Sequence, residues 1–292
     1  MNGFLNLLKP PGMTSHDVVQ VARRTLRTKA IGHTGTLDPA AAGVLVLTVG
    51  YATRLGEYVA DAVKGYRAEI ALGVTTDSGD VEGAVTARAS AADVTEERVR
   101  AALGDLTGTV TMRPPVHSAV RVNGERLYKL ARAGEAVEAP ERVVEVYALE
   151  LLEFVPCTDT ALVRVDVTCS KGTYIRSLAT MLGEKLGCGA HLSMLIRTRV
   201  GAMRIDEAVT LEELAADPAR PLLTAQQAIP DLPRVMVSEP QREALVHGQA
   251  VQAVELAQGP VLVYDEAGEL VCLGESSGEL IQPHKVFQKS QH

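Results

Sequence analysis

The chain has 292 residues, of which 46% are hydrophobic, and it carries a formal net charge of −7. This length supplies a large core and predicts either one sizeable domain with a small one or two ordinary domains. A membrane-spanning protein is not expected, because the longest apolar run, Val44 to Val49, has the length of a strand. The first residues lack the pattern of a secretory signal, and we therefore expect a soluble cytoplasmic protein.

The negative charge is unevenly distributed along the chain. Residues 231–292 carry nine acids and four bases, whereas residues 1–230 carry 27 acids and 25 bases. Three windows in the first part are basic: Lys9–His33, Met112–Arg132 and Arg164–Arg204. A phosphate backbone responds to local potential more than to net charge, so these windows are compatible with a nucleic-acid partner. Ordinary solvated faces would produce the same pattern.

Strands and helices alternate in the part of the chain before residue 218. Capping residues mark helix starts, and apolar alternation marks strands. In chain order we expect a strand at 4–8, a helix opened by Thr14 and Asp17, a buried strand at 43–49, a helix around 55–63, a strand from Lys64, an alternating strand at 161–169 and a helix at 175–186 ended by Gly187. This mixture predicts an α+β domain with a central, largely antiparallel sheet flanked by helices.

Four prolines, at positions 218, 221, 230 and 233, predict a linker after a short helix that a Thr210–Glu213 capping box opens. Beyond the linker, a second box at Ser238–Gln241 is followed by brief apolar runs separated by turns such as Asp265–Gly268. This pattern predicts a small, mostly β module. The expected domains are therefore residues 1–230 and residues 231–292.

Sequence motifs for bound cofactors are missing. There is neither a G-x-x-x-x-G-K-[ST] phosphate loop nor a G-x-G-x-x-G motif, so nothing predicts ATP, GTP or a dinucleotide. Gly274–Gly278 matches G-x-S-x-G, but no helix pattern follows it, and we interpret it as a turn. The four cysteines form no C-x-x-C pair. Four residues could form a metal site only if the fold brought them together, because their spacing in the sequence is not that of metal ligands: His33, Asp38, His117 and His191.

A loop rich in glycine and threonine, Gly32–Gly43, contains a single acid, Asp38, directly before Pro39. Proline restrains the preceding residue to an extended or turn conformation, and the glycines permit close approach of another backbone. An aspartate in such a loop is commonly a turn or capping residue. A catalytic carboxylate is the alternative, but the loop alone favours the turn residue.

Three further segments carry candidate site residues. Lys64–Arg67 opens a strand and presents an aromatic ring at its start. Ser170–Arg176 lies between the alternating strand and its helix, where backbone amides and a lysine would meet an anion. Gly187–Leu192 leads into the next basic strand. Taken singly, Tyr66 is better explained as a core residue, Arg176 as a surface cation and His191 as a loop residue.

Taken together and in order, these segments resemble the TruB family of pseudouridine synthases. The resemblance covers most of the chain and rests on Lys9–Ser15, Gly32–Gly43, Lys64–Tyr66, Arg113–Ala119, Asn123–Tyr128, Cys169–Arg176 and Gly183–His191. Near the end of the chain, Val263–Asp265 and Pro283–Phe287 resemble a PUA module. The departures are small: Ala40 and Ala42 stand where bulkier residues are frequent, and Ile196 stands where a basic residue is frequent, which puts one phosphate contact in question.

The resemblance implies the pseudouridine synthase fold and an enzyme that isomerises uridine to pseudouridine at position 55 in the T-arm of tRNA. Because the base is cleaved at N1, turned and rejoined through C5, reactant and product are isomers, and no cofactor or metal is expected. Asp38 is then the essential carboxylate, as nucleophile or as base, with Arg176 as its cationic partner. Tyr66 stacks on the extruded uracil and is a candidate for taking the C5 proton. Its ordinary pKa of about 10 makes positioning the safer role.

The resemblance also implies substrate-binding roles and a partner. Lys9 helps to hold the loop around Asp38, and His33 holds the gap left by the flipped uridine. Tyr174 and Leu195 line the base pocket. Arg197 is a further substrate-binding residue. An insertion at about 108–145 is expected to grip the T-arm, and the C-terminal module to touch RNA farther from the site. The expected partner is tRNA, bound by a monomer.

Three other functions compete with this interpretation. One of them, a metal-dependent hydrolase, would lose activity with a chelator. A catalytically silent tRNA-binding protein on the same fold would not keep Asp38, Tyr66 and Arg176 together. A relative directed by a guide RNA is usually longer and carries lysine-rich tails, which this sequence lacks.

Overall fold

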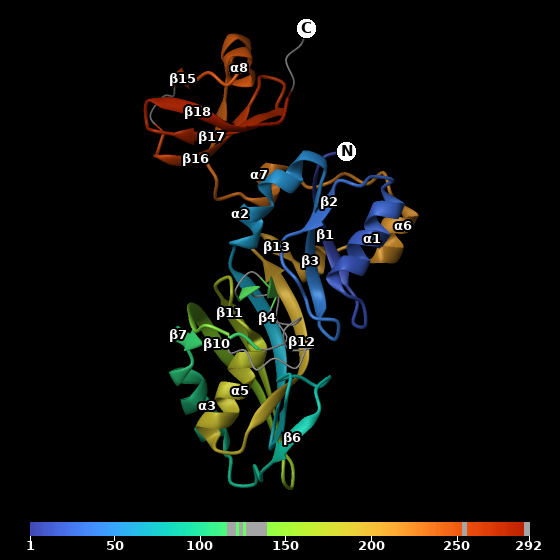
Figure 1. Cartoon of the computed structure of the whole chain (residues 1–292), viewed down its shortest axis with the longest axis vertical. Coiled ribbons are helices and arrows are strands. Elements are labelled where there is room, and N and C mark those ends of the chain that lie inside the picture. Colours follow the sequence, from blue (N-terminus) through green and yellow to red (C-terminus); the bar gives the residue numbers. More distant parts are fainter. Residues whose placement is uncertain (116–120, 123–124, 127–138, 253–255, 289–292) are drawn as a thin grey trace.

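The computed structural model describes residues 1–115, 121–122, 125–126, 139–252 and 256–288. In this part of the chain, nine strands form one large sheet, whose main path runs β1-β3-β12-β4-β11-β10-β7, with β2 beside β3 and β13 beside β12 (Figure 1). The strands are β1 (Gly3–Lys9), β2 (Ile31–His33), β3 (Ala42–Val49), β4 (Lys64–Leu72), β7 (Gly108–Met112), β10 (Arg142–Pro156), β11 (Ala161–Cys169), β12 (Ala190–Val200) and β13 (Met203–Arg204).

The pairing within this sheet is antiparallel except between β3 and β12, which run parallel. The predicted α+β class with a largely antiparallel central sheet is therefore confirmed. Two short hairpins stand apart from it: β5 (Val74–Thr76) with β6 (Val85–Arg88), and β8 (Arg121–Val122) with β9 (Glu125–Arg126). The second hairpin belongs to the predicted insertion, of which residues 116–120, 123–124 and 127–138 lie outside the described part.

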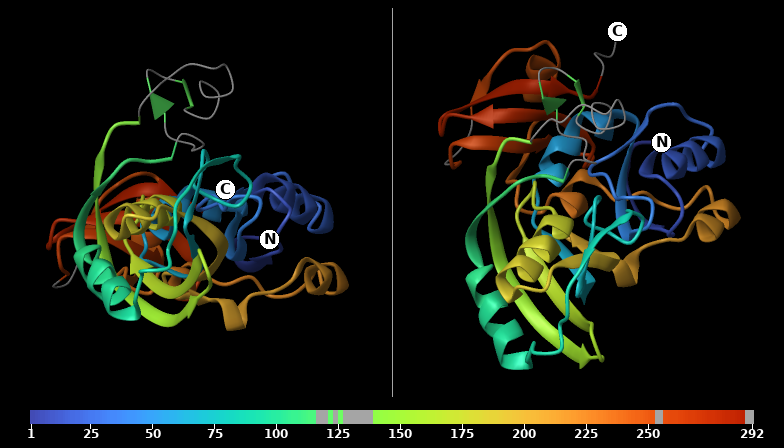
Figure 2. Two further views of the ribbon diagram at one scale, coloured as in Figure 1. Left: turned by 90° about the horizontal axis from the view of Figure 1, so that it is seen from below. Right: turned by 60° about the horizontal axis from the view of Figure 1, so that its bottom comes forward.

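The helices cover the sheet in two groups. They are α1 (Ser15–Thr25), η1 (Gly50–Leu55), α2 (Gly56–Ala60), α3 (Glu96–Asp105), α5 (Ile175–Leu186), η2 (Ile205–Glu207), α6 (Leu211–Ala216) and α7 (Ala225–Ala228). Helices α3 and α5 pack together on the β4, β10 and β11 side of the sheet (Figures 1 and 2). Helices α1 and α6 cover β1–β3, whose run of apolar residues is buried on both faces.

Local sequence explains where two of these helices begin and end. The Thr14 hydroxyl accepts the backbone N–H of Asp17, whose carboxylate accepts the N–H of Thr14, so the predicted capping box opens α1. Gly187 ends α5 in a left-handed conformation with φ 79°, which other residues rarely adopt. The start of α5 is therefore fixed relative to β11 by a connection of only a few residues, and Arg176 lies in its first turn.

Two expected elements differ from the structure. The helix expected around 55–63 is a 3₁₀ turn, η1, followed by the single turn of α2, and Val63 lies outside it. The segment expected as a linker, 218–233, is packed against the large domain. Phe4 and Leu223 exchange backbone hydrogen bonds of 2.8 Å, and α7 buries Ala225 and Ala228. Edge strand β1 needs hydrogen-bonding partners, which this segment supplies.

The C-terminal residues form a second sheet with the order β14-β16-β17-β18-β15, at one end of the molecule (Figure 1). Its elements are β14 (Arg234–Met236), α8 (Glu239–Val246), β15 (Val251–Gln252), β16 (Gly259–Tyr264), β17 (Leu270–Ser276) and β18 (Leu280–Val286). Phe287 packs against Tyr51 of η1 with 4.9 Å between ring centroids, and Arg54 donates to the Val286 carbonyl at 2.7 Å. Within the described residues, no helix is long and apolar enough to cross a membrane.

Candidate functional site

A cavity of about 700 Å³ opens between the 33–39 loop, the start of β4, the start of α5 and strand β12. The three residues predicted to be catalytic, Asp38, Tyr66 and Arg176, all line it. Four of the five predicted substrate-binding residues line it as well: His33, Tyr174, Leu195 and Arg197. The fifth, Lys9, lies behind the loop. The fold thus brings together residues that are more than 150 positions apart in the sequence.

The register of three strands positions the cavity. On β12, Arg197 is opposite Tyr66 of β4 on one side and Gly43 of β3 on the other. A Cβ atom at Gly43 would lie 2.2 Å from the Arg197 carbonyl oxygen, and its φ is +110°. Only glycine permits β3 to approach β12 this closely. The loop before Gly43, which carries Asp38, is thereby brought beside Tyr66.

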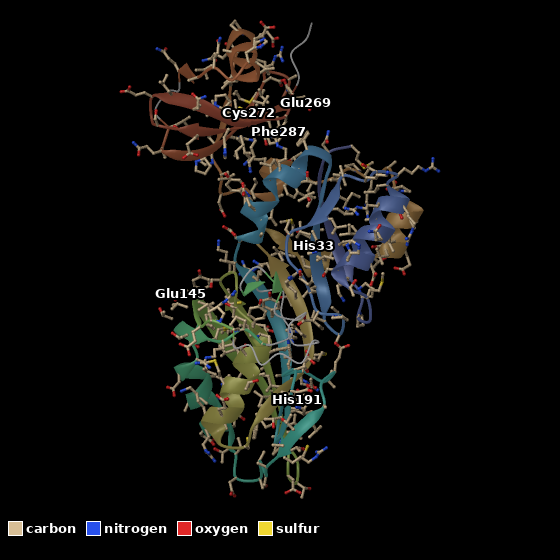
Figure 3. The ribbon with its side chains drawn as sticks, in the orientation of Figure 1. His33, Glu145, His191, Glu269, Cys272 and Phe287 are labelled. Atoms are coloured by element: carbon tan, nitrogen blue, oxygen red, sulfur yellow. The ribbon has the colours of Figure 1, made fainter. Side chains whose placement is uncertain are left out.

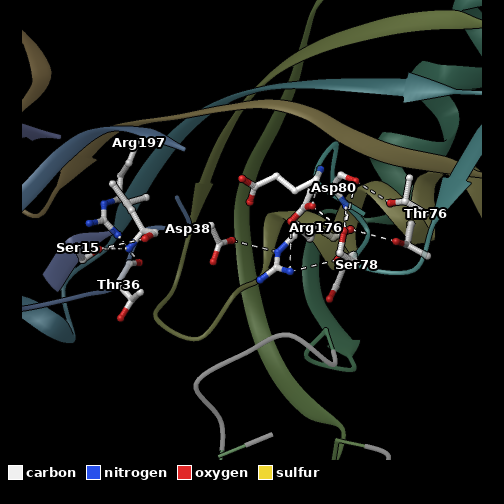
Figure 4. Close-up of polar contacts among 12 residues, drawn as sticks. Ser15, Thr36, Asp38, Thr76, Ser78, Asp80, Arg176 and Arg197 are labelled. Atoms are coloured by element: carbon white, nitrogen blue, oxygen red, sulfur yellow. Dashed lines mark hydrogen bonds and ion pairs between the residues drawn. The ribbon is translucent and has the colours of Figure 1, made fainter. Parts of the chain in front are cut away.

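Asp38 and Arg176 form an ion pair at the cavity wall, with 3.1 Å between Asp38 Oδ2 and Arg176 Nε (Figure 4). The Arg176 side chain is only 5% exposed, whereas that of Asp38 is 38% exposed and therefore accessible. Burial raises the pKa of Asp38, and the neighbouring charge of Arg176 opposes that rise. The carboxylate thus combines accessibility with a cation that favours its ionised form, as a nucleophile or base requires.

Arg176 has a second acidic partner, Asp80, which the sequence analysis did not identify. Arg176 Nη1 lies 3.4 Å from Asp80 Oδ2 and donates to the Ser78 carbonyl at 3.2 Å (Figure 4). Asp80 Oδ1 accepts hydrogen bonds from the Ser78 hydroxyl at 2.6 Å and from the Glu82 N–H at 3.1 Å. Asp80 is therefore held rigidly by its own loop and anchors the guanidinium from the side opposite Asp38.

Tyr66 is a nearly buried residue at the start of β4, with 8% exposure. Burial raises the pKa of its hydroxyl above the ordinary value, and the positive charge of Arg197 opposes this. The phenol is therefore protonated at neutral pH. A phenol that stays protonated is poorly suited to remove a proton. This electrostatic environment therefore favours a role for the Tyr66 ring in positioning the substrate base.

Arg197 and Lys9 direct their donors to the backbone of the loop that carries Asp38. Arg197 is 2% exposed and donates to the carbonyls of Val44, Thr36 and Gly35 at 2.7, 3.3 and 3.0 Å. Lys9 is fully buried and donates to the carbonyls of Pro10, Pro39 and Ala41 at 2.8, 3.1 and 2.6 Å. Lys9 thus binds the backbone of this loop from behind. Arg197 makes contacts of the same kind with this loop, and its side chain also hydrogen-bonds that of Tyr66.

The remaining lining residues have distinct surroundings. His33 ends β2, and its pKa is lowered, first by burial and then by the charge of Arg197, which favours a neutral imidazole. The Tyr174 ring lies under the Arg142 guanidinium, 5.6 Å from its carbon to the ring centroid. Leu195 on β12 supplies apolar surface beside Asp38. Together they provide an aromatic ring, an apolar side chain and an uncharged polar group around one carboxylate.

The possible metal ligands are not gathered into a cluster in the part of the chain that the structure describes. His33 and His191 lie in different parts of the molecule (Figure 3), and His191 Nδ1 is 2.9 Å from the Val74 carbonyl. His117 lies outside the described residues.

The sequence and the structure match known proteins along most of the chain. The family model of the TruB family pseudouridylate synthase N-terminal domain matches residues 23–175, and that of the tRNA pseudouridylate synthase B C-terminal domain matches residues 176–224. The tRNA pseudouridine synthase B of Symbiobacterium thermophilum is 52% identical over 86% of this chain and 83% of its own length. That of Heliobacterium modesticaldum is 42% identical over 99% of this chain and 96% of its own.

Solved structures are similar over almost the whole chain. The structure of an H/ACA ribonucleoprotein bound to a substrate RNA containing 2′-deoxyuridine contains a chain that is 27% identical, with a TM-score of 0.72. The match covers 98% of the present chain and 85% of that chain. A Cbf5-Nop10-Gar1 complex gives 30% identity and the same TM-score, with the same coverage of both chains.

Proposed function

Since the chain belongs to the TruB family of pseudouridylate synthases, we propose that it isomerises uridine 55 in the T-arm of tRNA to pseudouridine. The observation that carries the proposal is the accessible Asp38 carboxylate, paired with buried Arg176 in a cavity that also contains Tyr66. The relatives that match nearly the whole chain are tRNA pseudouridine synthases, which supports tRNA as the substrate.

The reaction requires three events at one nucleotide: the N1–C1′ bond breaks, the uracil turns, and C5 bonds to C1′. The C5 proton leaves and N1 ends protonated, so no redox equivalent or co-substrate is consumed. Asp38 acts on the ribose as nucleophile or as base, and either role needs the ionised form that Arg176 favours. The Tyr66 ring holds the uracil while it turns, and its protonated hydroxyl supplies no negative charge to the site.

A base within a stacked loop must be extruded to reach Asp38. The cavity has a volume in the range that encloses small ligands, and its walls suit a nucleotide. Tyr174 and Leu195 line the base position, and neutral His33, at the cavity edge, occupies the gap left in the RNA. A neutral imidazole enters a base stack with a smaller desolvation penalty than a charged one.

The remaining parts of the proposal concern RNA binding, cellular location and oligomeric state. The insertion at about 108–145 grips the T-arm, and the PUA-like module in residues 231–292 touches RNA farther from the site. The enzyme acts as a cytoplasmic monomer without cofactor or metal. Residues 1–230 thus carry the catalytic site and the insertion, and residues 231–292 form the second RNA-binding part.

The test is the single-turnover rate of pseudouridine formation on a T-arm stem-loop, with saturating enzyme. Asp38→Asn keeps the shape of the side chain but removes the nucleophile or base, and should lower the rate by at least ~10²–10⁴-fold with normal RNA affinity. Asp105→Asn, an exposed acid on α3, is the matched control. An Asp38→Asn variant that folds, binds and reacts within tenfold of the parent would remove Asp38 from the active site. Loss of pseudouridine 55 from tRNA should accompany deletion of the protein from cells.

A further inference from the structure

Lys64 is a buried cation in the cavity wall for which the mechanism above has no use. It is the first residue of β4, two positions before Tyr66, and is 8% exposed. Its side chain lines the same cavity as Asp38, Tyr66 and Arg176. Buried lysines are rare, because taking an ammonium out of water is unfavourable. A buried lysine at this position therefore needs a physical explanation.

The Lys64 ammonium is held by two backbone carbonyls. Its Nζ donates to Ala60 at 2.7 Å and to Ala62 at 3.0 Å. Ala60 is the last residue of α2, and Ala62 belongs to the turn that connects α2 with β4. Carbonyls at a helix C-terminus have no partner within the helix and carry partial negative charge, so a cation there stabilises the end of the helix. The lysine thus fixes the turn that leads into Tyr66.

This turn is itself part of the active site, because Ala60 lines the cavity together with Lys64 and Tyr66. The Lys64 side chain also approaches the loop that carries Asp38: a Cβ atom at Gly35 would lie 3.9 Å from Lys64 Cε. Lys64 therefore lies between the turn before Tyr66 and the loop that presents the carboxylate. Its side chain thus lies beside both of these cavity walls.

Strand β4 has little freedom to compensate for such a shift. A Cβ atom at Gly65 would lie 3.0 Å from Thr198 Oγ1 and 3.3 Å from Arg199 Cβ, so β4 packs tightly on β12 here. The pairing of β12 with β4 skips Thr198, which forms a bulge next to Tyr66. The start of β4 is thus held by β12 on one side and by the lysine-bound turn at its N-terminal end.

We propose that Lys64 is a positioning residue for the isomerisation, whose ammonium locks the 60–63 turn and thereby sets the place of the Tyr66 ring relative to Asp38. The proposal rests on the proposed function, since it concerns the same reaction. It predicts that the lysine affects the rate of the chemical step and leaves RNA affinity nearly unchanged, because its donors bind protein carbonyls.

The surroundings of Lys64 also predict a pH dependence. Burial, reinforced by the charge of Arg197 on β12, lowers the pKa of Lys64 to about 8. Asp61 in the turn and Cys169 on β11 oppose this, and Lys171 after β11 adds to it. The ammonium is therefore charged below about pH 8 and neutral above it. Deprotonation weakens its hold on the two carbonyls, so the rate should fall as pH rises through this value.

Two other groups near Lys64 also have shifted pKa values. Burial raises the pKa of Cys169 to about 11 and raises that of Tyr66 above its ordinary value. The Lys171–Asp61 ion pair, 2.7 Å long, is exposed on both sides. If Lys64 causes a rate decrease centred near pH 8, arginine at this position should abolish it, because a guanidinium stays protonated.

The test compares Lys64→Met and Lys64→Arg with Lys185→Met, an exposed lysine on α5 outside the cavity. Single-turnover rates with saturating enzyme are measured from pH 6 to 10, alongside affinity for a T-arm stem-loop. Lys64→Met should lower the rate at least ~10-fold with affinity within ~3-fold, whereas Lys64→Arg should retain the rate within ~3-fold and lose the decrease near pH 8.

Three results would overturn the proposal. One is a Lys64→Met variant with the parent rate. Another is a Lys64→Met variant that loses affinity for the stem-loop but reacts normally with saturating enzyme. The third is a Lys64→Arg variant that keeps the decrease near pH 8, which remains informative if Lys64→Met fails to fold. A parent enzyme that forms no pseudouridine would instead contradict the proposed function, so the two failures are distinguishable.

Discussion

Asp80→Asn tests whether the second carboxylate at Arg176 serves catalysis. At 3.4 Å and an effective dielectric constant of about 20, the gross attraction between the two charges is about 5 kcal/mol, much of which desolvation offsets. Asparagine keeps an oxygen for the bonds from Ser78 and Glu82, so we expect a loss of stability of only about 1–3 kcal/mol. Arg176 would lose an anchor, and the rate should fall by about 10–100-fold, equivalent to about 1.4–2.7 kcal/mol.

The same substitution makes a prediction about pH. The negative charge of Asp80 raises the pKa of Asp38, so removing that charge should lower it. If ionised Asp38 reacts, the acid limb of the single-turnover rate should then move to lower pH. Asp77→Asn, an exposed acid in the same loop, is the matched control. An Asp80→Asn variant within twofold of the parent rate and with an unmoved acid limb would refute the reasoning, even if its melting temperature fell.

Two further substitutions test the scaffold around the site. Gly43→Ala should lower the free energy of unfolding by about 1–3 kcal/mol from backbone strain alone and should slow the reaction, because β3 must withdraw from β12. Chemical denaturation of Gly43→Ala and of the control Gly104→Ala, where a Cβ atom has nothing within 4 Å, should show this difference in stability. Equal stabilities of the two variants would contradict the prediction. Phe287→Ala should cost about 1–3 kcal/mol by removing the contact with Tyr51, and should weaken tRNA binding more than single-turnover chemistry. A variant with normal affinity and a slow reaction would contradict this division of roles.

The elements that could be predicted from the sequence are those that local chemistry determines. The 161–169 strand alternates apolar residues without interruption, and capping boxes at Thr14 and Thr210 mark two helix starts. The helix around 55–63 was predicted too long, because apolar spacing does not distinguish a 3₁₀ turn and a single α-helical turn from one continuous helix. The prolines of 218–233 predicted a linker, but they carried no information on the packing of that segment against β1.

Asp80 was missed for a different reason. Its local pattern, Asp77-Ser78-Gly79-Asp80, is that of a turn, and nothing in it indicates a guanidinium 96 positions later. The contact arises because Asp80 forms a β-bridge with Leu192 of β12, which brings the loop to the start of α5. Only the tertiary structure contains this information. Asp38 and Arg176 were predicted from the family resemblance, since the Gly32–Gly43 loop alone favours an ordinary turn aspartate.

Two cations of the basic windows, Lys9 and Arg197, are buried behind the loop and hold its backbone. Lys9 and Arg197 add to the local positive charge of the sequence, yet both bind backbone carbonyls of the loop. A loop that is neither helix nor strand leaves its carbonyls without regular partners, and burying them unpaired would be unfavourable. The cations satisfy the carbonyls of Gly35, Thr36, Pro39 and Ala41, and the charge of Lys9 also lowers the pKa of Asp38. The loop conformation and the ionisation of its carboxylate therefore depend partly on the same side chain. This explains how a glycine-rich loop holds a reactive group in one place.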